Sequence, residues 1–342
     1  MDTDLNLEPD EKPACIACGN PEILEGYPNK LCAECRDKLI KFPIPVWVKL
    51  FGAAIAVLSL MSLFWSGGDF GAALALKRAE HAEENKNYLT EKHELEKAEK
   101  TVPNSIGILS HLAIADFYNL EYASMDSVLK KIQNRTFEDT ALLGKVNDLL
   151  ENVKSYYPSA SFDTAFSAYK KSVIPDSALE RYVDKSPGDT YAMYLLASSY
   201  SDKEQYGKTD TAVSKILAID PNFMPAICMK CMVKRELSQF DSSFYYCDKL
   251  LAINHQSTYA MSAKARTFIK SGKNAEGLKL AKQVDDLSKD DPYNVTTLAI
   301  AYHFNKDYKK RDQLIKQAEK DSASNSYMKY AKDIFSGKIK YQ

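Results

Sequence analysis

The chain has 342 residues, of which 45 are Lys or Arg and 46 are Asp or Glu, so its formal net charge is −1. This balance argues against a nucleic-acid coat or a polyanion binder, because such proteins need a clear excess of basic residues. A hydrophobic content of 45% excludes wholesale disorder, while the seven unevenly spaced Cys argue against a secreted disulfide scaffold.

The first predicted unit, residues 1–42, is a small zinc-binding module. Cys15 and Cys18 form one Cys-x-x-Cys pair, and Cys32 and Cys35 form a second pair after 13 intervening residues. Four thiolates at this spacing can hold one tetrahedral Zn²⁺ ion, and a closed shell of four favours a structural role over a catalytic one. A segment this short has too little apolar content to fold alone, so the metal would supply its stability.

A short hairpin over Ile23–Leu31 is predicted between the two Cys pairs, and a helix is predicted after the second pair. The order of knuckle, hairpin, knuckle and helix resembles a treble-clef or zinc-ribbon finger. Two separate redox pairs or structural disulfides are the alternatives. A thioredoxin-type redox pair needs a βαβ context, which the pattern of this segment does not show.

The second predicted unit, residues 44–66, is a single transmembrane helix. Its stretch from Leu50 to Trp65 carries no charge. Trp47 and Trp65 are 18 residues apart, which is ~27 Å along a helix and close to the hydrocarbon thickness of a bilayer. Aromatic residues at both interfaces are typical of a membrane span. The alternatives are a buried core helix or a signal peptide, although a signal peptide would start nearer to residue 1.

The charges that flank this span predict its orientation. Four basic residues precede it and Lys49 lies at its edge, whereas only Lys77 and Arg78 follow within a similar distance. The positive-inside rule therefore predicts a cytoplasmic N-terminus, where a reducing environment would also keep the finger thiols available for zinc. The repeats that follow would then be extracytoplasmic in a single-pass membrane protein. Small residues at 52–56 could form a helix-pairing face, which leaves a homodimer possible.

The third predicted unit, residues 72–342, is an array of repeated helix pairs. Pro187 and Pro221 each close a helical run and are 34 residues apart, and a further 34 residues lead to His255 at the end of a similar run. The longer interval between Pro103 and Pro187 leaves room for one extra helix over 138–156. A repeat of this period predicts a mainly α protein in which neighbouring units stack.

A 34-residue period with two helices resembles the tetratricopeptide (TPR) repeat. The helix-A Leu, small residue and Tyr of that pattern correspond to Leu196, Ala197 and Tyr200. The first Trp of the pattern is missing throughout, and Lys230 stands where a Leu is expected. The resemblance implies an α-solenoid of about seven helix pairs, and the frames that the period predicts are 72–105, 106–139, 156–189, 190–223, 224–257, 258–291 and 292–325, followed by a terminal helix over 326–337.

The resemblance also implies that the first helices line a concave groove that binds a protein or peptide. Aromatic and Arg side chains are the usual anchors of such interfaces. The alternative is that the abundant Tyr residues simply pack between repeats. Transferred by register, the predicted partner-binding residues are Tyr191, Tyr194, Met232, Arg235, Tyr259, Arg266, Lys270 and His303.

Other candidate ligands in the repeats are scattered. Cys228 and Cys231 share a helix, and Cys247 follows in the same repeat, so core packing, a second metal site and a disulfide are all open. Core packing is favoured because unpaired Cys is commonly buried. His111 and His303 lack partners at ligand spacing.

These features predict a membrane-anchored interaction scaffold rather than an enzyme. No nucleophile elbow, phosphate loop or dinucleotide fingerprint occurs in the sequence. The array would bind a protein partner on one side of the bilayer, and the finger with its one structural Zn²⁺ would lie on the other. The alternative is a transmembrane regulator that senses zinc or thiol redox state through the finger.

Overall fold

The computed structural model describes residues 13–40, 45–169, 173–289, 291–320 and 325–342. Within these ranges, the side chains of Ile40, Leu60, residues 62–69 and Asn325 are not described. The regular elements of the described residues are all helical. The chain divides into two compact units, Met1–Gly67 and Gly68–Gln342.

The first unit contains α1 (Ala33–Ile40) and the beginning of α2 (Val46–Glu84). Backbone hydrogen bonds from Leu24 N to Leu31 O (3.0 Å) and from Ile16 N to Lys30 O (3.0 Å) bring the chain back on itself before α1. The hairpin expected over Ile23–Leu31 is therefore present only as a loop, since no strand is assigned to it.

The transmembrane helix expected at 44–66 is not found in the described part of the chain, where no helix combines the length and the apolar character needed to cross a membrane. Ile44 lies outside the described residues, and so do the side chains of Leu60 and residues 62–66.

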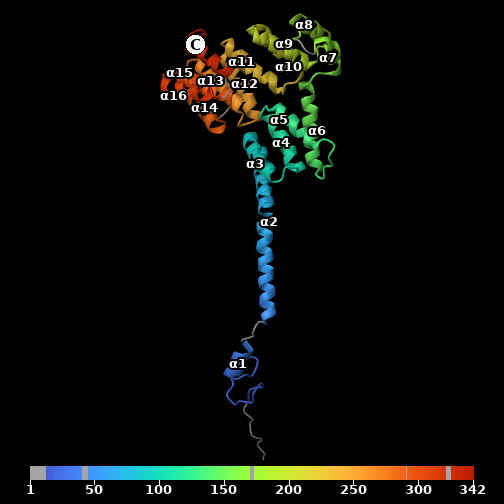
Figure 1. The fold of residues 1–342 in the computed structure, drawn as a ribbon, viewed down its shortest axis with the longest axis vertical. Helices are drawn as coiled ribbons and strands as arrows, with labels where there is room; N and C mark the ends of the chain where they lie inside the picture. The colour runs from blue at the N-terminus through green and yellow to red at the C-terminus, as the bar shows by residue number, and fades with distance from the viewer. Residues whose placement is uncertain (1–12, 41–44, 170–172, 290, 321–324) are drawn as a thin grey trace, which may run out of the picture. The chain divides into compact units, whose positions relative to one another are not determined.

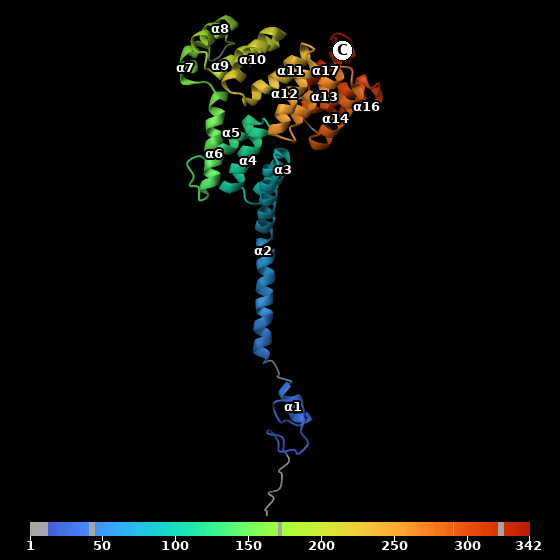
Figure 2. The same ribbon diagram turned by 180° about the vertical axis from the view of Figure 1, so that it is seen from behind.

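The second unit is built from helix pairs, which Figures 1 and 2 show from opposite sides. Its helices after α2 are α3 (Tyr88–Thr101), α4 (Ile106–Tyr118), α5 (Tyr122–Ile132), α6 (Thr140–Val153), α7 (Ala160–Ala165), α8 (Asp176–Lys185), α9 (Thr190–Asp202), α10 (Tyr206–Ile219), α11 (Met224–Glu236), α12 (Phe240–Ile253), α13 (Thr258–Lys270), α14 (Asn274–Leu287), α15 (Pro292–Phe304), α16 (Tyr308–Ala318) and α17 (Asn325–Phe335), with short 3₁₀ turns η1 (Lys154–Tyr156) and η2 (Ser167–Tyr169).

The predicted 34-residue period is present in four consecutive helix pairs. Helices α9, α11, α13 and α15 begin at residues 190, 224, 258 and 292, and α10, α12, α14 and α16 begin at 206, 240, 274 and 308. The side chains of Asp189, Ser257 and Asp291 cap three of the first helices by accepting a backbone N–H hydrogen bond. Helix-pair repetition is therefore confirmed at the level of helix starts and caps.

The frame predicted at 156–189 is irregular. Its first helix is replaced by α7 and η2, and α8 begins only at Asp176. Pro158 interrupts the helical path after η1, because proline removes a backbone donor and clashes with the preceding turn. Pro175 then stands at the N-cap of α8. The extra helix expected over 138–156 is confirmed as α6 followed by η1.

The beginning of the second unit, around α3 and α4, contacts the end of α12, which is far away in sequence. The backbone N–H of His255 donates to Lys86 O (2.9 Å), and the Asn254 side chain donates to Asn119 Oδ1 (3.0 Å). Leu95 and Leu112 share one hydrophobic cluster with Leu250 of α12. The contact is made where α3 begins and α12 ends, since Lys86 Nζ donates to Ala252 O (3.1 Å) and Thr90 N donates to Gln256 Oε1 (2.9 Å). A linear solenoid has contacts only between neighbouring repeats, so this array departs from that arrangement.

Candidate functional site

The four predicted zinc ligands converge in the first unit. The sulfur atoms of Cys15, Cys18, Cys32 and Cys35 all lie within 4.8 Å of one another. Gly19 adopts a left-handed φ of 76°, and this turn lets Gly19 N donate to Cys15 O (2.8 Å). The second pair is positioned by α1, which begins directly after Cys32. The four cysteines could therefore hold a metal ion, as their spacing predicts.

The electrostatics of this cluster favour a bound cation. A backbone hydrogen bond from Cys32 is the main cause that lowers the pKa of the Cys15 thiol to about 6. The neighbouring thiols, Cys18 first among them, raise the pKa of Cys35 to about 12. Like charges at this distance oppose each other, so four thiolates can coexist only when a cation neutralises them. The separation between Cys18 Sγ and Cys32 Sγ is 3.6 Å, which is too long for a disulfide.

The predicted groove residues of the later repeats form a second candidate site. First helices of successive pairs contact one another, α11 with α13 and α13 with α15. We call their shared surface, which carries Arg235, Arg266 and Lys270, the inner face. Arg235 Nε donates to Glu236 Oε1 (3.0 Å), and Lys270 also pairs with Glu236. Both Arg side chains are buried.

Arg266, on α13, links two helices of the inner face. Its Nε donates to Thr297 Oγ1 (2.7 Å), and its Nη2 donates to Tyr293 O (3.2 Å). The guanidinium carbon lies 4.0 Å from the centre of the Tyr293 ring, which adds a cation–π contact. These contacts join α13 to α15, so Arg266 has a structural role whether or not it also contacts a partner.

A segment of the chain itself lies on the inner face. Residues 336–342 follow α17 and are not helical. The Tyr341 hydroxyl donates to Arg266 O (3.4 Å), and the Gln342 side-chain amide donates to Asn274 Oδ1 (2.7 Å) and to Ile269 O. Tyr341 is only 4% exposed, and burial raises its pKa. Tyr341 and Gln342 therefore lie against α13, where the sequence predicts a groove.

The remaining predicted groove residues are half-buried, and the aromatic ones among them pack against other aromatic rings. Tyr191 contacts Phe162 edge to face at 5.1 Å, and Tyr194 lies 5.9 Å from Phe223. The ring contacts of the others are Tyr259 stacked on Tyr293 at 5.2 Å and His303 stacked on Phe335 at 4.6 Å. Met232 is also half-buried. Packing between repeats explains these aromatic contacts, while the binding of a partner by this set stays a prediction.

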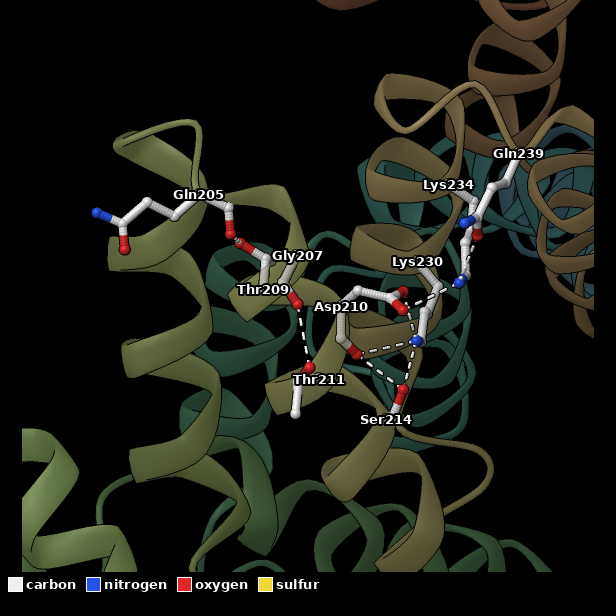
Figure 3. A network of polar contacts seen from close by, with 9 residues as sticks. All are labelled: Gln205, Gly207, Thr209, Asp210, Thr211, Ser214, Lys230, Lys234 and Gln239. Atoms are coloured by element: carbon white, nitrogen blue, oxygen red, sulfur yellow. Dashed lines mark hydrogen bonds and ion pairs between the residues drawn. The ribbon is translucent and has the colours of Figure 1, made fainter.

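Lys230, the departure from the TPR pattern, is explained by a polar network between α10 and α11 (Figure 3). Lys230 is 2% exposed and donates to Asp210 Oδ1 (2.6 Å) and to Ser214 Oγ (2.6 Å). Lys234 donates to Asp210 Oδ2 (2.9 Å). The Leu contact of the pattern is thus replaced by a buried ion pair, which sequence reasoning missed although Asp210 and Lys230 were the available signal.

Cys231 and Cys247 are fully buried in the core, which confirms the prediction of core packing. They and Cys228 do not join any potential metal-binding group among the described residues. Burial also raises the pKa of the Cys228 thiol. His111, by contrast, was expected to lack ligand partners, and this expectation is wrong because folding brings Glu83 and Glu91 beside it.

No known protein-family model matches the chain, and no curated protein matches it. Among solved structures, it is similar to a tetratricopeptide repeat protein from Parabacteroides merdae, with 14% identity, a TM-score of 0.42 and coverage of 78% of this chain and 98% of that one. It is also similar to YrrB, described as a TPR protein with an unusual peptide-binding site, with 16% identity, a TM-score of 0.35 and coverage of 60% and 97%.

A third similar structure is the TPR2AB domain of yeast Sti1 in a complex with pHSP90, with 13% identity, a TM-score of 0.29 and coverage of 72% and 98%. At these identities and scores, the likeness does not extend to function. The TPR-like helical fold therefore rests on the helix starts, caps and pair contacts described above.

Proposed function

We propose that this protein is a non-enzymatic interaction scaffold whose inner face binds an extended segment of a partner protein. The observation that carries the proposal is the position of residues 336–342. This non-helical segment buries one aromatic side chain, Tyr341, and donates hydrogen bonds to backbone carbonyls of α13. An inner face that accommodates its own chain in this way can accept a partner segment of the same chemistry.

The preferred partner segment carries an aromatic residue. Lys270 Nζ lies 5.4 Å from the centre of the Tyr341 ring, so the inner face offers a cation to an aromatic ring. The backbone carbonyls of Arg266 and Ile269 on α13 accept hydrogen bonds from the side chains of Tyr341 and Gln342. Residues 336–342 and the partner would compete for these groups, which makes the site self-occluded until a partner displaces the segment.

The test uses a variant that ends at Phe335 and a fluorescent peptide with the sequence of residues 336–342. We expect fluorescence anisotropy to show saturable binding of the peptide to the shortened variant and much weaker binding to the full chain. A matched peptide with Tyr341→Ala should bind at least tenfold more weakly. If the shortened variant keeps its helical circular dichroism spectrum but does not bind the peptide, the proposed site is wrong.

We further propose that residues 44–66 anchor the protein in a membrane, with the N-terminus in the cytoplasm. The sequence pattern supports this proposal, and so does the exposure of Trp47 (69%), Leu50 (65%) and Phe51 (62%) on α2. Large apolar side chains that no protein surface covers favour an apolar environment. Resistance of the protein to alkaline carbonate extraction from membranes is the expected outcome, whereas release into the soluble fraction would contradict the anchor.

The finger would contribute a rigid module held by one structural Zn²⁺ on Cys15, Cys18, Cys32 and Cys35. The alternative function, a transmembrane regulator that senses zinc or thiol redox state through the finger, is favoured only by the exposure of Cys18. The two functions differ in their response to peroxide. A structural finger keeps its zinc at physiological peroxide concentrations, whereas a sensor releases it.

A further inference from the structure

Glu83, Glu91 and His111 come together where the end of α2, α3 and α4 meet in the second unit. Their ligand atoms all lie within 4.8 Å of one another. His111 Nδ1 is 2.9 Å from Glu83 Oε2 and 3.7 Å from Glu91 Oε1. Neither the finger nor the inner face uses these three residues, so the cluster needs an explanation of its own.

Three buried side-chain atoms of this cluster, both carboxylate oxygens of Glu91 and Nδ1 of His111, lack a hydrogen bond among the described residues. Glu91 is 0% exposed, yet neither of its carboxylate oxygens has a hydrogen-bond partner among the described residues. His111 is 7% exposed, and its Nδ1 also lacks a hydrogen bond of acceptable geometry. Buried polar groups in native proteins are almost always hydrogen-bonded. The 3.7 Å ion pair with His111 leaves the buried Glu91 carboxylate without any hydrogen bond, which is costly. The arrangement indicates that a further group belongs between these atoms.

The spacing of the atoms fits a metal ion. Oxygen and nitrogen ligands lie ~2.0–2.2 Å from a divalent transition ion, so adjacent ligand atoms are roughly 3.0–3.5 Å apart. The separations of 2.9 Å and 3.7 Å lie close to this range. Lys145 Nζ donates to Glu83 Oε1 (2.7 Å), which fixes the outer oxygen and leaves Oε2 facing His111. A cavity of about 440 Å³ borders Glu83, His111 and Lys145 and has room for water ligands.

We propose that Glu83, Glu91 and His111 form a second metal site, which binds one divalent first-row transition ion through two carboxylates and one imidazole. This donor set suits Zn²⁺, Mn²⁺ and Fe²⁺, whereas the four thiolates of the finger select zinc. The ion would neutralise Glu91 and tie the end of α2 to α3 and α4. The proposal does not depend on the function of the inner face.

The test counts zinc in the full-length protein. The wild type, Glu91→Gln, His111→Ala and the double variant Cys18→Ser/Cys35→Ser are dialysed against buffered Zn²⁺, and the bound metal is measured by mass spectrometry. We expect the Glu91→Gln and His111→Ala variants each to lose one ion relative to the wild type, and the double Cys variant to keep that ion. Glu151→Gln, which changes an exposed carboxylate on α6, is the matched control and should lose none.

A second readout separates metal binding from a metal-free ion network made by the same residues. In the double Cys background, added Zn²⁺ should raise the melting temperature, and Glu91→Gln should abolish that rise and weaken Zn²⁺ binding at least tenfold. The proposal is overturned if the Glu91→Gln variant binds as much zinc as the wild type, or if the double Cys variant binds none. Gln has nearly the same size as Glu, so this variant preserves the packing of α3.

Discussion

At the scale of single residues, Asp210 is the centre of the polar network in Figure 3. It pairs with Lys230, whose side chain is 3% exposed, and with Lys234. We predict that Asp210→Ala lowers the free energy of unfolding by about 3 kcal/mol, because it leaves the Lys230 charge buried without its partner. Urea denaturation measures this loss. Asp248→Ala, which breaks an exposed ion pair with Lys264, should cost less than about 1 kcal/mol. Similar losses from both variants would contradict the buried ion pair.

Asp210 should also make the stability of the protein depend on pH. Burial alone would raise the pKa of Asp210, but hydrogen bonds from Lys230 and Lys234 lower it below its ordinary value. Its contribution is therefore fully present above the unfolded-state pKa of about 3.9 and is lost as the pH falls through the lower folded-state pKa. Denaturation of the wild type and Asp210→Asn across this range should show a difference in stability that shrinks on acidification. A constant difference would exclude this role.

At the scale of elements, the turn inside each helix pair repeats a left-handed residue. Glu204, Ser238 and Lys306 have positive φ values, and Gly272 occupies the equivalent position in its own pair. Only glycine adopts this conformation without steric cost. We predict that Ser238→Gly raises the free energy of unfolding by about 1 kcal/mol, and that Gly272→Ser lowers it by a similar amount. Thermal denaturation of the two variants tests both predictions. Melting temperatures that change in the same direction would contradict them.

The first residues of the helices could be predicted from the sequence where the repeat is regular. The 34-residue interval gave the first residues of α9, α11, α13 and α15 because each pair must present the same faces to its neighbours. The frame at 156–189 holds α7 and α8, but its first helix is short, and the irregularity of this helix was not predicted from the period. Cys15 and its three partners were predictable from local spacing, whereas Glu83, Glu91 and His111 meet only after three helices pack.

At the scale of the whole second unit, contact between the first helices and α12 is a feature that no repeat period encodes. Asn254 is 1% exposed, and its side chain donates to Tyr118 O (3.1 Å) and to Asn119 Oδ1 (3.0 Å). We predict that Asn254→Ala costs about 1–3 kcal/mol, because it leaves a buried carbonyl unsatisfied. Hydrogen exchange should quicken in α3 and α4 more than in α15. Uniform exchange changes would contradict a specific link between distant repeats.

Tyr341 and Gln342 contact α13, so under the proposed function residues 336–342 and a partner would compete for the inner face. This competition could not be predicted from the register of the groove residues, because register places Arg266 on a face but does not show what lies over it. Because residues 336–342 would occupy the inner face, a partner would have to bind more tightly than they do in order to displace them. If the inner face binds a partner, removal of residues 336–342 should increase the binding of that partner at α11 and α13.

The central claim is tested most directly by site-specific photo-cross-linking to the native partner. The cross-linker is placed at Met232 on α11 or, as a control, at the exposed Lys279 on α14, in the full chain and in the chain that ends at Phe335. We predict partner adducts from position 232, with a higher yield in the shortened chain, and none from position 279. Adducts from position 279 alone, or a yield at position 232 that the shortening does not change, would contradict binding at the inner face.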